Sequence, residues 1–285
     1  MMTYLYRRAI RLAACIPIAL LSYLLLMAPP AKAQGTLLAP DATLAGKSQY
    51  AWSQEWWKTM MALPADSNPI LDTTGVFAAQ GDKGQVFLLA GSGDSGPVVR
   101  NVTVQSNQYL FFPLLNGVDW AAISAYGGGL TNMQRDVAEF FGLNAQGDAP
   151  QATFFAQLNG SDLTLPPSTP SLQAFRQASP DTYELFVTDN NIFGAAGSAP
   201  GTFSAISDGW WGALAPLTPG NYTLHYGGSV QGYGAYEGSL FSQDLTYHLT
   251  VVATPEPGSV ALFAAGCLVS GTGWIVRRRK GMATI

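Results

Sequence analysis

Two histidines and an aspartate near the end of the chain are residue types that bind metal ions. His225 and His248 lie in two stretches that alternate apolar and polar residues, each on the polar side of its stretch. If these stretches pair as neighbouring strands, both imidazoles lie on one face, close to Asp244. Two neutral imidazoles and a carboxylate are a ligand set that holds Zn²⁺. The simpler interpretation is one surface histidine on each strand, without a metal.

A serine in the stretch SGDSGPVV, residues 92–99, is a second candidate for chemistry. The stretch resembles the nucleophile loop of trypsin-like proteases, Gly-Asp-Ser-Gly-Gly-Pro, with one glycine missing. A serine nucleophile needs a histidine base that a third group orients. Both histidines follow Ser95, whereas the trypsin order places the histidine first. Gly, Asp, Ser and Pro are also turn residues, so we interpret the stretch as a turn and expect no protease.

Carboxylates are numerous but form no recognisable ligand or catalytic motif. None of them lies in an EF-hand loop of the form Asp-x-Asp-x-Asp-Gly, although a Ca²⁺ site made of loop carbonyls and scattered carboxylates is compatible with the sequence. A glycoside hydrolase needs two carboxylates at a set separation, which spacing along the chain does not identify. The candidates considered are Asp181, Glu184, Asp189, Asp208, Glu237 and Asp244.

Four aromatic residues are candidate contacts for a glycan. Trp210 and Trp211 are adjacent, and neighbouring side chains of a strand point to opposite faces, so we expect one of them to be exposed. Tyr233 and Tyr236 lie in a glycine-rich loop, residues 227–239, which can present them for stacking on sugars. The alternative is that all four pack against their own domain.

Two helices are predicted among the elements that position these residues. The spacing of Trp52, Trp56, Met60 and Leu63 predicts a helix over residues 48–63 with one apolar face, which we expect to be buried. A second helix is predicted over residues 132–143.

In this second helix, Met133, Val137 and Phe140 or Phe141 are expected to face inward, and Asp136 and Glu139 to lie elsewhere. Its start has Thr131 and Gln134 at capping-box spacing. A further short helix is compatible with residues 171–177.

The rest of the chain reads as short strands separated by Gly, Pro, Asn and Asp turns. We expect strands at residues 85–91, 98–105, 108–116, 152–160, 182–188, 210–217, 221–228 and 244–252. Eight such strands predict a mainly β fold, an antiparallel β-sandwich of jelly-roll type that the helices pack against or cap. This domain would span residues 48–253, after a lead-in arm at residues 34–47.

The amino-terminal 33 residues have the features of a secretory signal peptide. Three arginines within the first eleven residues precede an apolar run, and a small-x-small site at Ala31 and Ala33 follows it, so we expect cleavage after Ala33 by signal peptidase. A permanent amino-terminal anchor is the alternative.

At the other end, residues 258–276 contain no charge and are long enough to span a bilayer as a helix. A basic cluster follows this span, as the positive-inside rule requires of a cytoplasmic end. The residues that frame the span are Pro255, Glu256 and Pro257 before it, and Arg277, Arg278, Arg279 and Lys280 after it.

The order Pro-Glu-Pro, span and arginine cluster resembles the PEP-CTERM sorting signal of bacteria, here residues 254–285. The resemblance implies transient insertion in the inner membrane of a Gram-negative-type bacterium and cleavage by the membrane protease exosortase. Release or transfer to the cell surface or extracellular matrix would follow. The alternative is a plain stop-transfer anchor that the protein keeps.

The stretches WSQEWWKTMMALPADSNPILDTTG, GQVFLLAGS, YLFFPLLN, VTDNNIFG, ISDGWWGALAPLTPGNYTLHYGG and FSQDLTYHLTVV resemble a widespread family of uncharacterised secreted bacterial proteins, over residues 50–252. Relatives tend to carry one cysteine after the Phe of TTGVF and another in the strand after PVVR. This chain has Ala78 and Asn101 or Val102 there, so that disulfide is absent. The resemblance supports the fold and export and transfers no catalytic residue.

Removing both ends changes the composition of the part that remains. Residues 34–254 keep six basic and 17 acidic residues, a net charge of about −11 against −4 for the whole chain, and contain neither of the two cysteines. Nucleic acid and anionic lipid surfaces need clustered Lys and Arg, so they are not expected as partners. We therefore expect a cell-surface or matrix protein, structural or exopolysaccharide-associating and without catalysis. The alternative is a secreted polysaccharide hydrolase that uses paired carboxylates.

Overall fold

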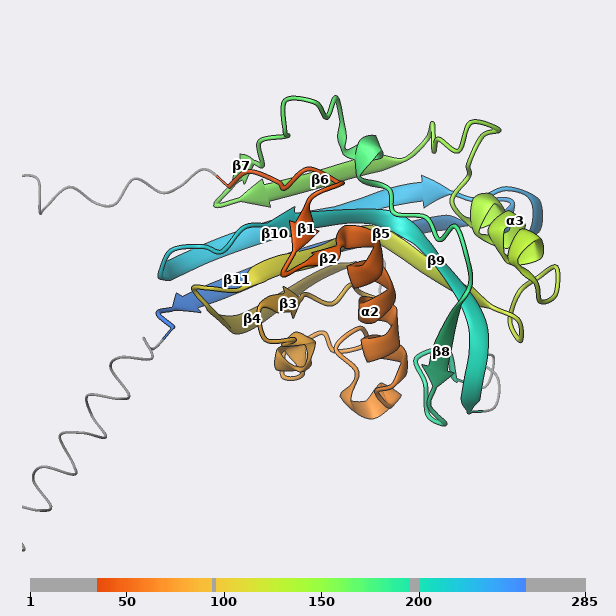
Figure 1. Cartoon of the computed structure of the whole chain (residues 1–285), viewed down its shortest axis with the longest axis horizontal. Helices are drawn as coiled ribbons and strands as arrows, with labels where there is room; N and C mark the ends of the chain where they lie inside the picture. The colour runs from red at the N-terminus through yellow and green to blue at the C-terminus, as the bar shows by residue number, and fades with distance from the viewer. Residues whose placement is uncertain (1–34, 94–95, 195–199, 255–285) are drawn as a thin grey trace, which may run out of the picture. The chain divides into compact units, whose positions relative to one another are not determined.

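The computed structural model describes residues 35–93, 96–194 and 200–254, and all of them fall within one compact unit. This region is mainly β (Figure 1). A five-stranded sheet has the order β4 (Pro97–Gln105), β11 (Leu240–Val252), β10 (Gly220–Gln231), β6 (Thr153–Leu158) and β7 (Ser161–Asp162). A four-stranded sheet has the order β3 (Val86–Leu88), β5 (Tyr109–Trp120), β9 (Gly201–Leu214) and β8 (Tyr183–Val187). A small hairpin pairs β1 (Thr43–Leu44) with β2 (Lys47–Ser48).

All eight predicted strands are confirmed, but the expectation of purely antiparallel pairing is wrong. β4 runs parallel to β11, and β3 runs parallel to β5. The remaining pairs within the two sheets are antiparallel. The physical reason is that β4 and β5, although consecutive, belong to different sheets, so β4 finds its partner in the last strand of the domain instead of in a hairpin.

One hydrophobic core lies between the two sheets. On β10 and β11 the alternate residues Tyr222, Leu224, Leu245 and Leu249 are buried, as the period-two pattern of these strands predicts. They pack with residues of β5 and β9 in the same cluster, including Phe112. The five-stranded sheet therefore buries one face and leaves the other, which carries both histidines, toward solvent.

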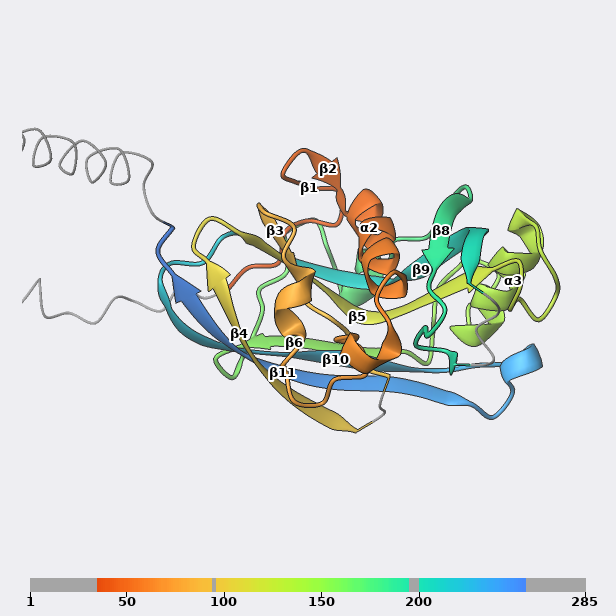
Figure 2. The ribbon, with the colours of Figure 1, turned by 90° about the horizontal axis from the view of Figure 1, so that it is seen from below.

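The second face of the four-stranded sheet is covered by the helix α2 (Gln49–Met61). Ser48 caps this helix by accepting a hydrogen bond of 3.1 Å from the amide of Ala51. Trp52, Trp56 and Met60 are buried as predicted, and they pack with residues of β3, β5, β8 and β9 in a second cluster. Figure 2 shows α2 on one side of β5 and β10 and β11 on the other.

The second helix, α3 (Leu130–Phe140), begins two residues earlier than predicted and does not use the expected capping box. Its cap is Gly129, with φ of 108°, and no side chain caps the first turn. Thr131 therefore lies inside the helix, because the positive φ that glycine tolerates places the cap two residues earlier, at Gly129. A 3₁₀ helix at Leu172–Phe175 takes the place of the short helix expected over residues 171–177.

The residues expected to form a lead-in arm pack on the domain. Leu37 is buried in the core between the sheets, and its amide donates a hydrogen bond of 3.0 Å to Thr164. Among the residues that the structure describes, no helix is long and apolar enough to cross a membrane. The predicted signal peptide, and all of the predicted sorting signal after Thr254, lie outside those residues.

Candidate functional site

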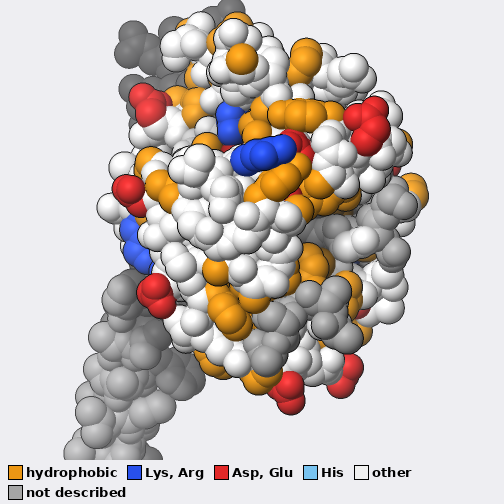
Figure 3. All heavy atoms as spheres, turned by 90° about the vertical axis from the view of Figure 1, so that its right-hand side faces the viewer, with side chains coloured by type: hydrophobic (Ala, Val, Ile, Leu, Met, Phe, Trp, Pro, Cys, Tyr) orange, Lys and Arg blue, Asp and Glu red, His pale blue; other side chains and the backbone are white. Residues whose placement is uncertain are grey.

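A cavity of about 410 Å³ opens where α2, β5 and α3 meet the loops that follow β3 and β10. Its walls are mostly apolar, and six aromatic side chains contribute to them. Figure 3 views the domain from the side on which α3 lies, where hydrophobic side chains gather beside acidic and basic ones. The aromatic residues of the wall are Trp56, Trp57, Phe140, Phe193, Tyr236 and Phe241.

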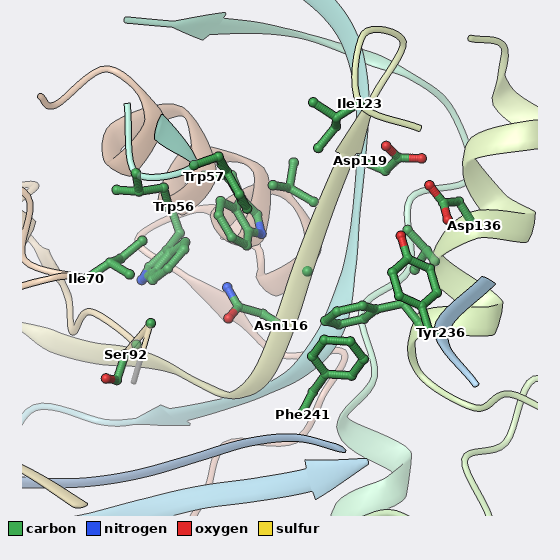
Figure 4. A pocket seen from close by; sticks show the side chains of 18 residues that line it. Trp56, Trp57, Ile70, Ser92, Asn116, Asp119, Ile123, Asp136, Tyr236 and Phe241 are labelled. Atoms are coloured by element: carbon green, nitrogen blue, oxygen red, sulfur yellow. The ribbon is translucent and has the colours of Figure 1, made fainter. Parts of the chain in front are cut away.

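Asp119 of β5 and Asp136 of α3 hold their carboxyl groups beside each other at one end of this cavity (Figure 4). The exposed fraction is only 4% for Asp119 and 3% for Asp136. Burial first, and then the charge of the neighbouring Asp136, raise the pKa of Asp119 to about 7, against the lowering effect of the Ser124 hydroxyl. Asp119 Oδ2 and Asp136 Oδ1 receive no hydrogen bond from the described residues, and two buried carboxyl groups beside each other do not both ionise readily.

Tyr236 completes this end of the cavity. Its hydroxyl points toward Asp136 (Figure 4), and burial, followed by the nearby carboxyl group of Asp136, raises the pKa of Tyr236 above its ordinary value. Asp136 is held from its other side, because its Oδ2 accepts a hydrogen bond of 2.8 Å from the amide of Ala125. Two carboxyl groups and a phenol therefore converge from a strand, a helix and a loop.

Glu139 fixes the loop that carries Tyr236 to α3. Its Oε2 accepts a hydrogen bond of 2.8 Å from the amide of Ala235 and another from the hydroxyl of Tyr126. The Nε of Arg135 donates to Oε1 at 3.0 Å. These contacts, the one from Tyr126 first, lower the pKa of Glu139, so this carboxylate stays ionised and holds the wall of the cavity in place.

Two hydrogen-bond donors lie toward the other end of the cavity. The indole of Trp56 donates to the carbonyl of Leu89 at 2.9 Å, whereas Nε1 of Trp57 and Nδ2 of Asn116 have no partner among the described residues. Figure 4 shows Trp57 and Asn116 between the carboxyl pair and Ile70. Buried polar groups normally have a partner, so these two donors are suited to acceptors on a ligand.

Arg100 supports the floor of the cavity from within the core. Its guanidinium is fully buried and donates to the carbonyls of Gly91 at 2.9 Å, Ile70 at 3.4 Å and Asp72 at 2.8 Å. Gly91 and Ile70 line the cavity. A single side chain of β4 thus ties two loops together, which positions the end of the cavity opposite the carboxyl pair.

The predicted exposure of one tryptophan of the 210–211 pair is wrong. Trp210 and Trp211 are both fully buried, the first in the core between the sheets and the second in the cluster under α2. Their side chains do point to opposite faces of β9, as expected, but this sheet is covered on both faces. Neither indole is therefore placed to contact a glycan.

The two loop tyrosines differ from each other. Tyr236 lines the cavity, where it packs edge-on against Phe140 with ring centroids 5.4 Å apart. Tyr233 is 42% exposed and does not line the cavity. Of the four predicted aromatic contacts, only Tyr236 lies in a concave site.

The predicted metal ligands are brought together in part. β10 and β11 pair as expected, and Nε2 of His225 lies 2.8 Å from Oδ1 of Asp244. His248 contacts Thr223 instead, at 3.3 Å, because the register places it diagonally beyond His225. In the part of the chain that the structure describes, no three His, Cys, Asp or Glu residues form a metal-binding group.

Sequence reasoning missed the carboxyl pair and placed Asp136 away from the buried face of its helix. The structure corrects this, since Asp136 and Glu139 are both buried. Among the carboxylates that were considered, Asp208 is bound to Arg176 by two hydrogen bonds, of 2.8 and 2.5 Å. A usable signal was Asp119 itself, a charged residue between Val118 and Trp120 in an otherwise uncharged strand.

Predicted residues that the structure does not describe are the sorting residues and Ser95 of the rejected protease loop. No protein-family model, curated protein or solved structure matches the chain. The resemblances on which export and sorting depend therefore stay predictions.

Proposed function

We propose that this chain is an exported cell-surface or matrix protein, delivered by the exosortase route, whose domain binds exopolysaccharide without catalysis. The observation that carries the proposal is the cavity, which combines aromatic walls with hydrogen-bonding groups at one end and in the middle. Sugars present apolar ring faces and hydroxyl groups that both donate and accept. Stacking on aromatic rings and hydrogen bonds to buried polar groups are the contacts that such a ligand needs.

The size of the cavity favours one end of a saccharide chain. A volume of about 410 Å³ lies within the range of small-molecule sites, roughly 300–1,000 Å³. The acidic character expected of the trimmed chain keeps such a protein soluble outside the cell and away from nucleic acid. We also propose that the fold class is a jelly-roll-like sandwich. Two sheets that share one core support this class, and two of the strand pairings in these sheets are parallel.

Retention of the producer's own exopolysaccharide by the full-length chain tests this function. Tyr236→Ala and Phe193→Ala remove walls of the cavity, while Tyr233→Ala removes a tyrosine of the same loop that is exposed and lines no cavity. We expect the first two to weaken retention about fivefold or more, since an aromatic contact contributes about 1 kcal/mol. Tyr233→Ala should retain the polymer as the parent does. Equal retention of the polymer by all variants would exclude the cavity as its binding site.

A polysaccharide hydrolase is the second candidate, and the carboxyl pair favours it. A pKa of about 7 lets Asp119 donate a proton near neutral pH. Two-carboxylate glycosidases, however, keep their carboxyl groups roughly 5–5.5 Å apart when retaining and about 6.5–9.5 Å apart when inverting. In this chain the two carboxyl groups face each other directly (Figure 4), which differs from two carboxyl groups that flank a scissile bond. Release of reducing ends from the exopolysaccharide, abolished by Asp119→Asn, would favour the hydrolase over binding alone.

A further inference from the structure

The charge of the cavity is one-sided. Asp119 and Asp136 both line it, and none of the described residues in its wall is a lysine or an arginine. Arg135 of α3 does not line the cavity, and its Nε donates a hydrogen bond to Glu139. The carboxyl pair therefore carries negative charge into a mostly apolar cavity without a cation from the protein.

Other buried charges among the described residues have partners within the protein. The carboxylate of Asp208 receives two hydrogen bonds from Arg176, and the buried guanidinium of Arg100 is surrounded by backbone carbonyls. Buried charges are costly unless they are paired or hydrogen-bonded. The pair of Asp119 and Asp136 differs from these because one oxygen on each residue has no donor among the described residues.

The walls beside the pair are suited to a cation as well. Tyr236, Phe140 and Phe241 form a group of rings, with centroids 5.4 Å apart for the first two and 3.8 Å apart for the last two. The faces of aromatic rings attract an ammonium group, and they do so most strongly where water is excluded. Carboxylates and rings thus favour the same kind of ligand group at this end of the cavity.

The groups farther along favour a ligand that also carries hydroxyl or ether oxygens. Nε1 of Trp57 and Nδ2 of Asn116 are donors without a partner, and Figure 4 places them between the carboxyl pair and the opposite end. A simple alkyl amine leaves both donors unpaired, whereas a sugar ring supplies oxygen acceptors.

We propose that the cavity recognises a saccharide unit with a free, protonated amino group, of the amino-hexose class, with the ammonium group against Asp119 and Asp136. This inference rests on the proposed function, because it names the class of saccharide that the same cavity binds. The ring of the sugar lies along the aromatic walls, and its oxygens accept hydrogen bonds from Trp57 and Asn116.

Binding of three β-1,4-linked trimers to the full-length chain tests the inference by calorimetry at pH 6.5. The trimers are those of glucosamine, N-acetylglucosamine and glucose, and only the first carries free amines. We expect the glucosamine trimer to bind at least about tenfold more tightly than the other two. Asp136→Asn keeps an oxygen for the amide of Ala125, so it should fold, and it should lower the affinity for the glucosamine trimer to that for the glucose trimer.

The matched control is Asp244→Asn, which removes a carboxylate on the outer face of the sheet and should bind all trimers as the parent does. Equal affinity for the three trimers would overturn the amine preference and leave glycan binding intact. If no trimer binds but the exopolysaccharide is retained, the inference is wrong and the proposed function stands. If neither binds, the inference and the proposed function both fail. Nα-acetyl-lysine amide that binds as tightly as the glucosamine trimer would overturn the choice of a saccharide.

Discussion

The carboxyl groups of Asp119 and Asp136 face each other (Figure 4), although one residue lies on a strand and the other on a helix. They are buried at the end of a cavity, and Tyr236 joins them from the loop between β10 and β11. Such a pair makes folding sensitive to pH, because one of its protons is held more tightly in the folded chain than in the unfolded chain.

The first prediction concerns this pH dependence. The pKa of Asp119 rises from 3.8 to about 7 on folding, so its contribution to stability is fully present below about pH 4 and is lost as the pH rises through 7. Asp119→Asn stays neutral, and we expect it to exceed the parent in stability by about 1–3 kcal/mol at pH 8 and to match it near pH 4. Urea unfolding followed by tryptophan fluorescence measures the difference. The control Asp41→Asn, at an exposed position, should show no such trend, and a constant gap for Asp119→Asn would contradict the raised pKa of Asp119.

Arg100 is predicted to be essential for the stability of the floor of the cavity. Arg100→Met fills much of the same space but removes every hydrogen bond to the carbonyls of Ile70 and Gly91. We expect a loss of about 3–5 kcal/mol in the free energy of unfolding, since buried carbonyls are left without donors. Arg135→Ala, which removes a largely exposed arginine, should cost less than about 1 kcal/mol. A small loss in the free energy of unfolding of Arg100→Met, measured by chemical denaturation, would show that the two loops keep their positions without Arg100.

The buried tryptophans of β9 are predicted to be structural. Trp210→Ala and Trp211→Ala should each destabilise the domain by about 3–5 kcal/mol, because each leaves a large hole in a different core. Tyr233→Ala, at an exposed loop position, should change stability by less than about 0.5 kcal/mol. Thermal unfolding compares the three. A stable Trp210→Ala variant that no longer retains exopolysaccharide would instead restore the idea of a surface contact.

Glu139 is predicted to control the cavity through the loop of Tyr236. Glu139→Gln keeps the shape of the side chain but loses the charge that strengthens its bonds with Ala235 and Arg135. We expect a several-fold weaker retention of exopolysaccharide with a loss of stability of about 1–2 kcal/mol. Glu184→Gln, at an exposed position of β8 that does not line the cavity, is the control for the loss of one negative charge. Unchanged retention by Glu139→Gln would mean that the loop does not depend on this bond.

Processing at the carboxyl end gives the last prediction. In surface material from the producing cell, peptide mass spectrometry should detect peptides that contain Trp211 and none that contain Trp274. Replacing Pro255, Glu256 and Pro257 by alanine should keep both peptides together in the membrane fraction. Surface-exposed wild-type protein that still contains Trp274 would contradict cleavage by exosortase.

Much of the fold was predictable because its signals are local. Alternation along β10 and β11 identified the buried residues Tyr222 and Leu249, and the spacing of Trp52, Trp56 and Met60 identified the buried face of α2. The start of α3 was mispredicted, because a glycine with positive φ can cap a helix where a capping-box pattern suggests a later start. The parallel pairing of β4 with β11 was not predictable, since it joins strands that are far apart in the chain.

The sequence by itself therefore determined the mainly β class and the two helices, because each depends on short-range pattern; the export and sorting signals stay predictions of the same kind. Only the tertiary structure decided that Trp210 and Trp211 are both buried, since that requires a sheet covered on both faces. It also decided the candidate site. Asp119, Asp136 and Tyr236 come from three elements, and only their packing brings two carboxyl groups and a phenol into one cavity.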